Sequence, residues 1–394
     1  MKKDIKFYCY FLPQFHECPY NNEWWGKGFT EWENVQKAKP LFAGHRQPRI
    51  PTGGYYDLSD LQTISSQFDE ASEYGIDGFV FFHYWYEGKR PLGKPLDLLL
   101  ANNDIRCSFS LCWANHSWTR SWKNRLGSLD VLIEQTYENT HQMLCNHYKF
   151  LNNAFQDNRY IRIEKRPLFQ IYIPQDIPNL PFFINGLREF CLKESNTEIH
   201  ICAMITAWQY EWDFLKYFDS ATLHQPALAF YSPVDIFSKI QPNQFNSDLL
   251  VAIIRSLPLS IKKILYPIQD KLFNKASYFD YTHTWEKLLL QTKKIQNSSV
   301  RIFPTAFVDF DNTPRYKDRA KIIKGFTPEL FGEYLNKLCS LVDSSPDHIM
   351  NVVFINAWNE WGEGMYLQSD VNYGNARLEQ VKKTKQKREG SDRN

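Results

Sequence analysis

Eight short apolar runs recur along the chain, separated for the most part by helical periodicity or by turns. Runs of this length indicate strands that are buried on both faces, and their alternation with helices indicates a parallel sheet. Eight such units close into a barrel, so the sequence predicts a single (β/α)8 TIM-like barrel of the α/β class rather than an open sheet. The runs span 5–12, 76–82, 105–113, 167–173, 198–205, 217–224, 300–308 and 350–357.

The segments between these runs contain clear helix signals. The best one covers 57–74, where apolar side chains recur at helical spacing and Gly75 follows as a C-cap. The helix expected over 328–343 begins with Pro328, a residue favoured at the first helical position. Further helices are expected over 134–157, 181–195 and 280–297.

The chain has 394 residues, enough for one barrel-sized domain, which we expect over 1–380. Residues 13–56 form a long aromatic-rich insertion with little periodicity, which is typical of a functional loop. A second insertion, 230–279, is apolar and basic, and we expect helices packed on the barrel there, with weak membrane-surface association as the alternative. The polar, basic tail 381–394 is expected to fray.

Composition excludes several classes of protein. A formal net charge of +2 lacks the dominant basic face of a nucleic-acid-binding protein. The eight cysteines form no CxxC pair, which indicates reduced thiols rather than disulfides or a zinc site. No run has the length of a membrane span, and the N-terminus lacks the apolar core of a signal peptide. We therefore expect a cytoplasmic protein.

Clusters of polar and aromatic residues follow five of the predicted strands. Because the carboxyl ends of barrel strands share one rim, these clusters should meet in one pocket, whose flat rings suit sugar faces. Ordinary packing is the alternative for any single tryptophan, and 311–314 is also a natural turn. The residues expected to bind substrate are Gln14, His16, His83, Tyr84, Trp85, Trp113, Asn115, Asp311, Asn359 and Trp361.

Two glutamates, Glu360 and Glu363, leave the last apolar run three residues apart. On one turn their Cβ atoms would lie roughly 5–6 Å apart, on the same side. Such a pair is badly placed to flank a sugar ring from opposite faces. It suits a substrate-assisted reaction, in which one carboxylate deprotonates a neighbouring sugar hydroxyl and the other protonates the departing oxygen. The structural alternative is a pair of ordinary ion-pair partners.

Several longer motifs carry a family resemblance. They are FLPQFH at 11–16, EWWGKGFTEW at 23–32, YGIDGF at 74–79, HYW at 83–85, KPL at 94–96, CWAN at 112–115, DNTPR at 311–315 and INAWNEWGEG at 355–364. In these motifs, which run through nearly the whole chain, the sequence resembles the WbsX-type proteins of bacterial surface-polysaccharide clusters. Those proteins belong with the glycoside hydrolase family 99-like domains. The resemblance implies a (β/α)8 barrel that acts on O-antigen, capsule or lipopolysaccharide glycans, where members are commonly named glycosyltransferases.

The resemblance also implies roles for individual residues. In the endo-acting mannosidases of family 99, a similar Asn-Glu-Trp-x-Glu element supplies both catalytic carboxylates. Carried over, Glu360 would deprotonate the sugar 2-hydroxyl to give a 1,2-anhydro intermediate, and Glu363 would be the acid/base at the glycosidic oxygen. The tryptophan-rich motif adds Trp25 to the expected pocket. The substrate would be an oligosaccharide or a lipid-linked glycan.

Two other functions stay open at this point. Asp309 and Asp311 could form the DxD motif of a metal-dependent nucleotide-sugar glycosyltransferase, although a lone DxD is weak evidence. A non-catalytic glycan-binding barrel would need the aromatic residues but not the glutamates. We expect no cofactor and no metal, because the paired glutamates lack further ligands at suitable spacing. The residues do not separate hydrolysis from transfer.

Overall fold

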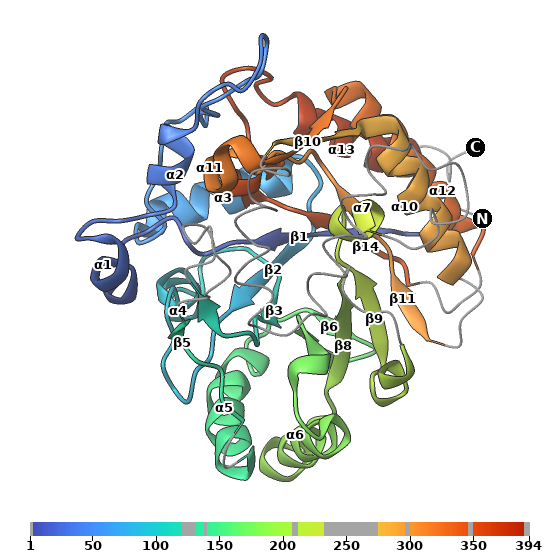
Figure 1. Ribbon diagram of the computed structural model, residues 1–394. Helices are drawn as coiled ribbons and strands as arrows, with labels where there is room; N and C mark the ends of the chain where they lie inside the picture. The colour runs from blue at the N-terminus through green and yellow to red at the C-terminus, as the bar shows by residue number, and fades with distance from the viewer. Residues whose placement is uncertain are drawn as a thin grey trace, which may run out of the picture.

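The chain folds into a barrel of parallel strands surrounded by helices (Figure 1). The computed structural model describes residues 3–119, 131–137, 140–206, 212–231, 275–295, 300–345 and 350–389. The barrel strands are β1 (Lys6–Phe11), β2 (Gly78–His83), β3 (Phe109–Trp113), β7 (Arg166–Ile171), β8 (His200–Ile205), β9 (Ser220–Leu223), β11 (Arg301–Phe303), β12 (Thr305–Phe307) and β14 (Val352–Asn356). Each predicted run overlaps one of these strands, and the seventh overlaps two.

The seventh run closes the barrel in two pieces. β11 pairs with β9 and β12 pairs with β14, while β14 pairs in turn with β1, and all of these ladders are parallel. The two pieces are separated by Pro304, which has no backbone N–H to donate to a ladder. Its carbonyl oxygen still accepts a hydrogen bond from the Phe354 N–H at 2.9 Å. The strands therefore form a ring broken only at this proline, and the predicted barrel is confirmed.

Side chains that alternate between the two faces of each strand form two separate apolar cores. Tyr10, Val80 and Cys112 belong to a cluster built almost entirely from strand residues, which fills the barrel. Phe11 and Phe81 belong to the larger cluster, which also contains residues of the surrounding helices. Because successive side chains of a strand point to opposite faces, the position of a residue in this alternation decides whether it faces the barrel interior or the helices.

Helices pack around the outside of the barrel. The five predicted helices are present as α3 (Leu61–Glu73), α5 (Thr140–Phe155), α6 (Leu180–Ser195), α10 (Tyr281–Ile295) and α12 (Pro328–Asp343). Their ends differ from the predicted ones by at most six residues, and the largest difference is at the start of α5. The Thr327 hydroxyl caps α12 by accepting from the Leu330 N–H. A short helix, α4 (Lys94–Ala101), was not predicted, because eight residues give too little periodicity to recognise.

The tail that we expected to fray is instead helical as far as Glu389. It belongs to α13 (Ala376–Glu389), and its basic side chains find acidic partners on the barrel. The Lys385 ammonium lies 2.6 Å from the Asp77 carboxylate, and the Arg388 guanidinium lies 2.6 Å from that of Asp343. These paired charges dock the helix, so a polar composition alone was a poor guide to order.

The first insertion, 13–56, contains two short helices, α1 (Pro19–Trp25) and α2 (Trp32–Lys37). Of the second insertion, 230–279, residues 232–274 lie outside the described ranges, so neither the helices nor the membrane-surface association expected there are tested. Its described flanks are α7 (Ala227–Tyr231) and β10 (Ser277–Asp280), and β10 pairs with β13 (Lys321–Lys324). Within the described part of the chain, every helix is too short or too polar to cross a membrane.

Candidate active site

Both predicted glutamates lie in one tight turn after β14. The turn consists of β15 (Asn359–Glu360), the 3₁₀ helix η5 (Trp361–Glu363) and β16 (Met365–Tyr366), and β15 and β16 pair as antiparallel strands. Gly364 ends the helix with φ 61°, a conformation that suits glycine. The turn projects from the carboxyl end of the barrel, where barrel enzymes hold their reactive groups.

One arginine binds both glutamates. Arg315 lies on the short helix α11 (Thr313–Tyr316), and its Nη2 is 3.0 and 3.2 Å from the two carboxylate oxygens of Glu360. Its Nη1 is 2.9 Å from Oε1 of Glu363. The third nitrogen, Nε, donates to Oε1 of Glu31 at 2.9 Å. We call Glu31, Arg315, Glu360 and Glu363 the glutamate cluster. The two glutamates therefore project towards the same guanidinium, and they also make the ion pairs of the structural alternative.

The glutamate cluster is buried and has more negative than positive groups. The side chains of Glu31 and Glu360 are 3% and 6% exposed, whereas Glu363 is 24% exposed. Burial raises the pKa of Glu360 to about 8, although the Arg315 charge acts in the opposite direction. Burial also raises the pKa of Glu31. A carboxyl group that titrates near neutral pH can serve as either acid or base.

Other polar groups surround this cluster. Burial raises the pKa of the Tyr84 and Tyr172 phenols, and the charges of the glutamates raise it further. The Tyr84 ring stacks on Trp118 with the ring centroids 5.5 Å apart. Burial lowers the pKa of Lys321 to about 8, and the nearby Glu363 opposes this shift. Burial likewise lowers the pKa of His224, which lies close to the same glutamate. Such groups can hold sugar hydroxyls.

Sequence analysis identified only part of this set. Glu31 and Arg315 were inside recognised motifs but were not proposed as site residues, and Tyr172, His224 and Lys321 were missed. Tyr172 and His224 each follow a barrel strand directly. A systematic search of the residues just after every strand would have found these two.

Three predicted sugar-binding residues instead belong to the core between barrel and helices. Trp113 is fully buried and stacks on Phe183 of α6, and Trp85 stacks on His147 of α5 with the centroids 4.8 Å apart. Nε2 of His83 lies 2.9 Å from Nε2 of His147. These contacts do not suit stacking on a sugar, so for these residues the packing alternative applies.

Two predicted asparagines tie strand ends together. The Asn359 amide accepts from the Leu12 N–H at 2.8 Å and donates to the Leu12 carbonyl at 2.9 Å, which extends the pairing of β1 with β14. The Asn115 amide makes the same two-way contact with the backbone of Ile173, just after β7. Both side chains are fully buried. They support the rim, and their hydrogen-bonding groups are used within the protein.

Trp361 separates the two glutamates in the sequence but is fully buried. Its ring stacks on Tyr366 at 3.6 Å between centroids, and its N–H donates to Gln368. It is therefore part of the packing beneath the turn, and burial excludes a direct sugar contact.

The remaining predicted residues lie in the first insertion. Gln14 and His16 are buried, and burial lowers the pKa of His16. Trp25 stacks on Phe29 with the centroids 5.5 Å apart. The part of these side chains in the pocket stays a prediction.

Asp311 anchors the first insertion. Its fully buried carboxylate accepts from His45 and Gln47 at 2.8 and 2.7 Å, and Arg49 lies 3.4 Å away. Although burial opposes the shift, these partners hold the pKa of Asp311 well below its usual range. Arg49 also binds Asp309 at 2.8 Å. Protein donors thus occupy both carboxylates of the DxD motif, which removes the support for a metal site there. Elsewhere in the described ranges no three acidic, histidine or cysteine residues are grouped to hold a metal.

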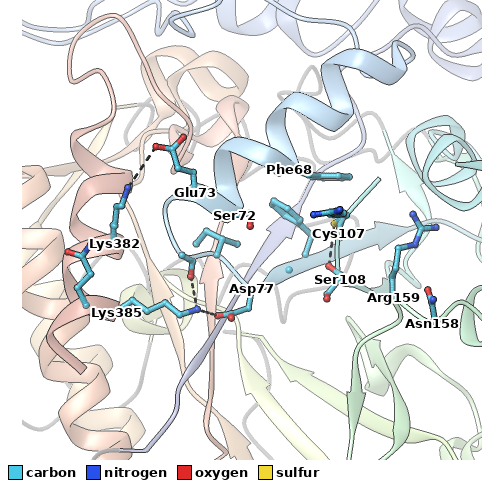
Figure 2. A pocket seen from close by; sticks show the side chains of 16 residues that line it. Phe68, Ser72, Glu73, Asp77, Cys107, Ser108, Asn158, Arg159, Lys382 and Lys385 are labelled. Atoms are coloured by element: carbon cyan, nitrogen blue, oxygen red, sulfur yellow. Dashed lines mark hydrogen bonds and ion pairs between the residues drawn. The ribbon is translucent and has the colours of Figure 1, made fainter. Parts of the chain in front are cut away.

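A cleft of about 800 Å³ opens at the other end of the barrel, beside α3 and α13 (Figure 2). Figure 2 shows that Lys385 reaches Asp77 and that Lys382 reaches Glu73 across this cleft. It borders the amino ends of β2 and β3, where conserved chemistry is rare in barrel enzymes. Its lysines are paired with acids, so we do not assign catalysis to it.

Solved structures show the same barrel fold. A "glycoside hydrolase-like protein" superimposes with a TM-score of 0.58 at 14% identity, covering 97% of this chain and 94% of that chain. The GH99 endo-alpha-mannosidase from Bacteroides thetaiotaomicron superimposes with a TM-score of 0.54 at 11% identity, covering 100% of both chains. Identities this low establish the fold alone.

The chain belongs to the Glycosyltransferase WbsX family, which matches residues 7–381. Two similar relatives are uncharacterized WxcX proteins from two strains of Xanthomonas campestris pv. campestris, 29% and 30% identical over 373 residues. The match covers 94% of this chain and 48% of each relative, so the chain spans about half the length of the curated relatives it matches. The protein is therefore a member of a carbohydrate-active family with a family 99-like barrel.

Proposed function

We propose that this protein acts on glycosidic bonds with retention of configuration, through Glu360 and Glu363, during assembly of a bacterial surface polysaccharide such as O-antigen, capsule or lipopolysaccharide. One observation carries the proposal: both glutamates lie on one turn at the carboxyl rim and bind the same guanidinium. The substrate is an oligosaccharide or a lipid-linked glycan. We place the reaction in the cytoplasm, where the free cysteines found among the described residues would stay reduced.

The shared turn favours a substrate-assisted reaction. Glu360 takes the proton of the sugar 2-hydroxyl, the 2-oxygen attacks the anomeric carbon, and the glycosidic bond breaks as Glu363 protonates the leaving oxygen. Water or an acceptor hydroxyl then opens the 1,2-anhydro sugar. In that second step Glu363 removes the proton of the attacking hydroxyl, and Glu360 returns its proton to the 2-oxygen. Two inversions at the anomeric carbon give net retention.

The electrostatics suit this division of roles. Glu360 is the more buried carboxyl, and a pKa raised to about 8 makes its anion a stronger base than an ordinary carboxylate. Glu363 is the more exposed and can meet a glycosidic oxygen that enters from solvent. If Glu360 is the base, kcat/KM rises with pH towards 8. If it were the acid, kcat/KM would fall over the same range.

The first test is a substrate panel. The purified protein is incubated with α-mannoside-type oligosaccharides and with nucleotide sugars, each with and without EDTA. We expect EDTA-insensitive turnover of an oligosaccharide or glycan substrate. Nucleotide release that requires a divalent metal would instead establish a nucleotide-sugar transferase, and binding of the glycan without turnover would establish a glycan-binding barrel.

A 2-fluoro analogue of the substrate found in that panel tests the mechanism. It lacks the 2-hydroxyl that Glu360 would deprotonate, so we expect it to bind and remain intact. An ordinary nucleophile would instead tend to trap a covalent glycosyl-enzyme. Intact-mass detection of an adduct on Glu360 would overturn the substrate-assisted reaction and leave the site assignment in place.

A further inference from the structure

Glu31 reaches the turn that carries both glutamates from the distant first insertion. It lies directly before α2, and its carboxylate accepts from Nε of Arg315 at 2.9 Å. Its side chain is only 3% exposed, so neither the contact nor the charge is weakened much by solvent. No role has so far been given to this third carboxylate.

The geometry of Arg315 explains why the Nε contact matters. A guanidinium is planar and its five N–H bonds point in fixed directions, so fixing one edge fixes the others. With Nε held by Glu31, Nη2 faces Glu360 and Nη1 faces Glu363. Without Glu31, the guanidinium could turn and serve one glutamate better than the other.

The backbone of the turn also packs against this ion pair. A Cβ atom at Gly362 would lie 2.6 Å from Oε1 of Glu31 and 2.9 Å from Nε of Arg315, so only glycine fits between the glutamates. Glu31 and Arg315 therefore set the position of the turn as well as its charge.

The charges in the glutamate cluster do not balance. Two buried carboxylates, Glu31 and Glu360, and the partly exposed Glu363 share one guanidinium, so full ionisation would leave an excess negative charge in a largely buried region. Retaining a proton relieves this excess. Each of the three carboxylates contributes to this excess negative charge, including Glu31, which lies outside the turn that carries Glu360 and Glu363.

We propose that Glu31 is a positioning residue, which holds the Arg315 guanidinium against both glutamates and supplies negative charge that favours the protonated form of Glu360. Its effect on turnover rests on the proposed function. Its effect on the proton affinity of Glu360 does not, and can be measured without any substrate.

The other titratable groups near the pair do not offer the same control. Burial raises the pKa of the four nearby phenols, those of Tyr56, Tyr84, Tyr172 and Tyr316, which keeps them neutral between pH 5 and 9 on the scale of an ordinary tyrosine. Lys321 and His224 act on Glu363 from β13 and from the loop after β9. The phenols that face Glu360 are those of Tyr56, Tyr84 and Tyr172.

The test is a titration of Glu360 in the full chain. Protein labelled with ¹³C at the glutamate carboxyl carbon is followed by NMR from pH 5 to 10, and the Glu360 signal is identified by its loss in Glu360→Gln. Glu31→Gln removes one negative charge beside the same guanidinium. We expect the midpoint of Glu360 to fall by about one unit or more. The matched control is Glu33→Gln, on the exposed side of α2, which should leave the midpoint unchanged. An unchanged midpoint in Glu31→Gln would overturn the proposal.

A second variant keeps the proposal testable if Glu31→Gln does not fold. Glu31→Asp preserves the negative charge, but its side chain is one methylene shorter, so its carboxylate lies further from Nε of Arg315. We expect the midpoint of Glu360 to stay within about half a unit, because the charge remains, while kcat falls about tenfold with little change in KM. Wild-type kcat in Glu31→Asp would overturn the positioning role. If the wild-type protein turns over no glycan, the proposed function fails, but the NMR titrations still decide the inference. An unchanged Glu360 midpoint in Glu31→Gln, or a Glu360 midpoint lowered by more than half a unit in Glu31→Asp, would overturn it.

Discussion

Asp311 and Glu360 are buried carboxyl groups on the same rim of the barrel, yet their surroundings are opposite. Asp311 accepts hydrogen bonds from His45 and Gln47 and also lies beside Arg49. Among the residues that the structure describes, Arg315 is the one charged donor to Glu360, which shares it with two other carboxylates. As a result the pKa of Asp311 is lowered, whereas that of Glu360 is raised to about 8.

The ratio of donors to carboxylates distinguishes a carboxylate held in its ionised form from a carboxyl group that titrates near neutral pH. An excess of donors stabilises the ionised form of Asp311 and fastens the first insertion to the barrel. A shortage of donors leaves the glutamate cluster with a proton that it can give up or recover near neutral pH. Sequence analysis assigned both carboxylates to one pocket, and only the contacts separate their roles.

The largest effect that we expect is on turnover. Glu363→Gln removes the proton donor with almost no change of shape, so kcat on a substrate with a poor leaving group should fall about 10²–10⁴-fold, while the melting temperature holds. Glu333→Gln, which removes an exposed glutamate of α12, is the control and should keep full activity. Wild-type turnover in Glu363→Gln would remove this residue from the mechanism.

Substitution of Asp311 should lower the stability of the fold. Asp311→Asn leaves Arg49 and His45 without their ionised acceptor, so unfolding in urea should require about 3–5 kcal/mol less free energy at pH 7. Because the folded-state pKa of Asp311 is lowered, its stabilising effect is present above the unfolded pKa and is lost as the pH falls below about 4. The difference between variant and wild type should shrink there. Asp318→Asn, an exposed aspartate of the same region, is the control. Equal stability of Asp311→Asn and wild type at pH 7 would refute the anchoring role.

Glu360 should show the opposite dependence on pH. Its folded-state pKa is raised, so the stability that it contributes is fully present below the unfolded pKa of about 4.3 and is lost as the pH rises through about 8. Glu360→Gln cannot ionise and should escape this loss. Between pH 6 and pH 9 the variant should gain about 2 kcal/mol in unfolding free energy relative to wild type. A constant difference across this range would contradict the raised pKa.

Gly362→Ala tests how closely the turn packs on the ion pair. The added Cβ would lie 2.6 Å from Oε1 of Glu31, so the turn or the ion pair must move. We expect a stability loss of about 1–3 kcal/mol and roughly a tenfold loss of kcat. Gly53→Ala, whose Cβ would meet nothing within 4 Å, is the control for stability. Unaltered kinetics in Gly362→Ala would show that the geometry of the cluster tolerates displacement.

The sequence was sufficient for the fold because eight buried strands leave a strong apolar signal and their alternation with helices fixes the architecture. It was not sufficient for His83, Trp85 and Trp113. Strands of a barrel are apolar on both faces, so no contrast in polarity shows which residues point inward and which point towards the helices. Phe81 and His83 share the face that packs on the helices, and the pattern of the run does not reveal it.

The glutamates were recognisable because they lie together in the sequence, whereas their partners were not. Glu31 and Arg315 meet only after the barrel closes and the first insertion folds over its rim. Long-range pairings of this kind leave no periodicity for a single sequence to display. The same reasoning covers Asp311 with Arg49, which the sequence presented as a turn and as a metal motif but not as an ion pair.

The pairing of β1 with β14 has a consequence for how the protein is made. Lys6 to Cys9 in the first strand pair with Val352 to Ile355 in the last, so a ribosome delivers one partner long before the other. At about 5–20 residues per second, the backbone groups on that edge of β1 wait tens of seconds for their ladder. Over most of the same interval Glu31 lacks Arg315, and over all of it Glu31 lacks the turn that carries Glu360 and Glu363. The nascent chain thus has an unpaired edge on β1, which favours aggregation, and an incomplete glutamate cluster. Synthesis of the last strand and of the turn after it allows that edge to pair and the cluster to form.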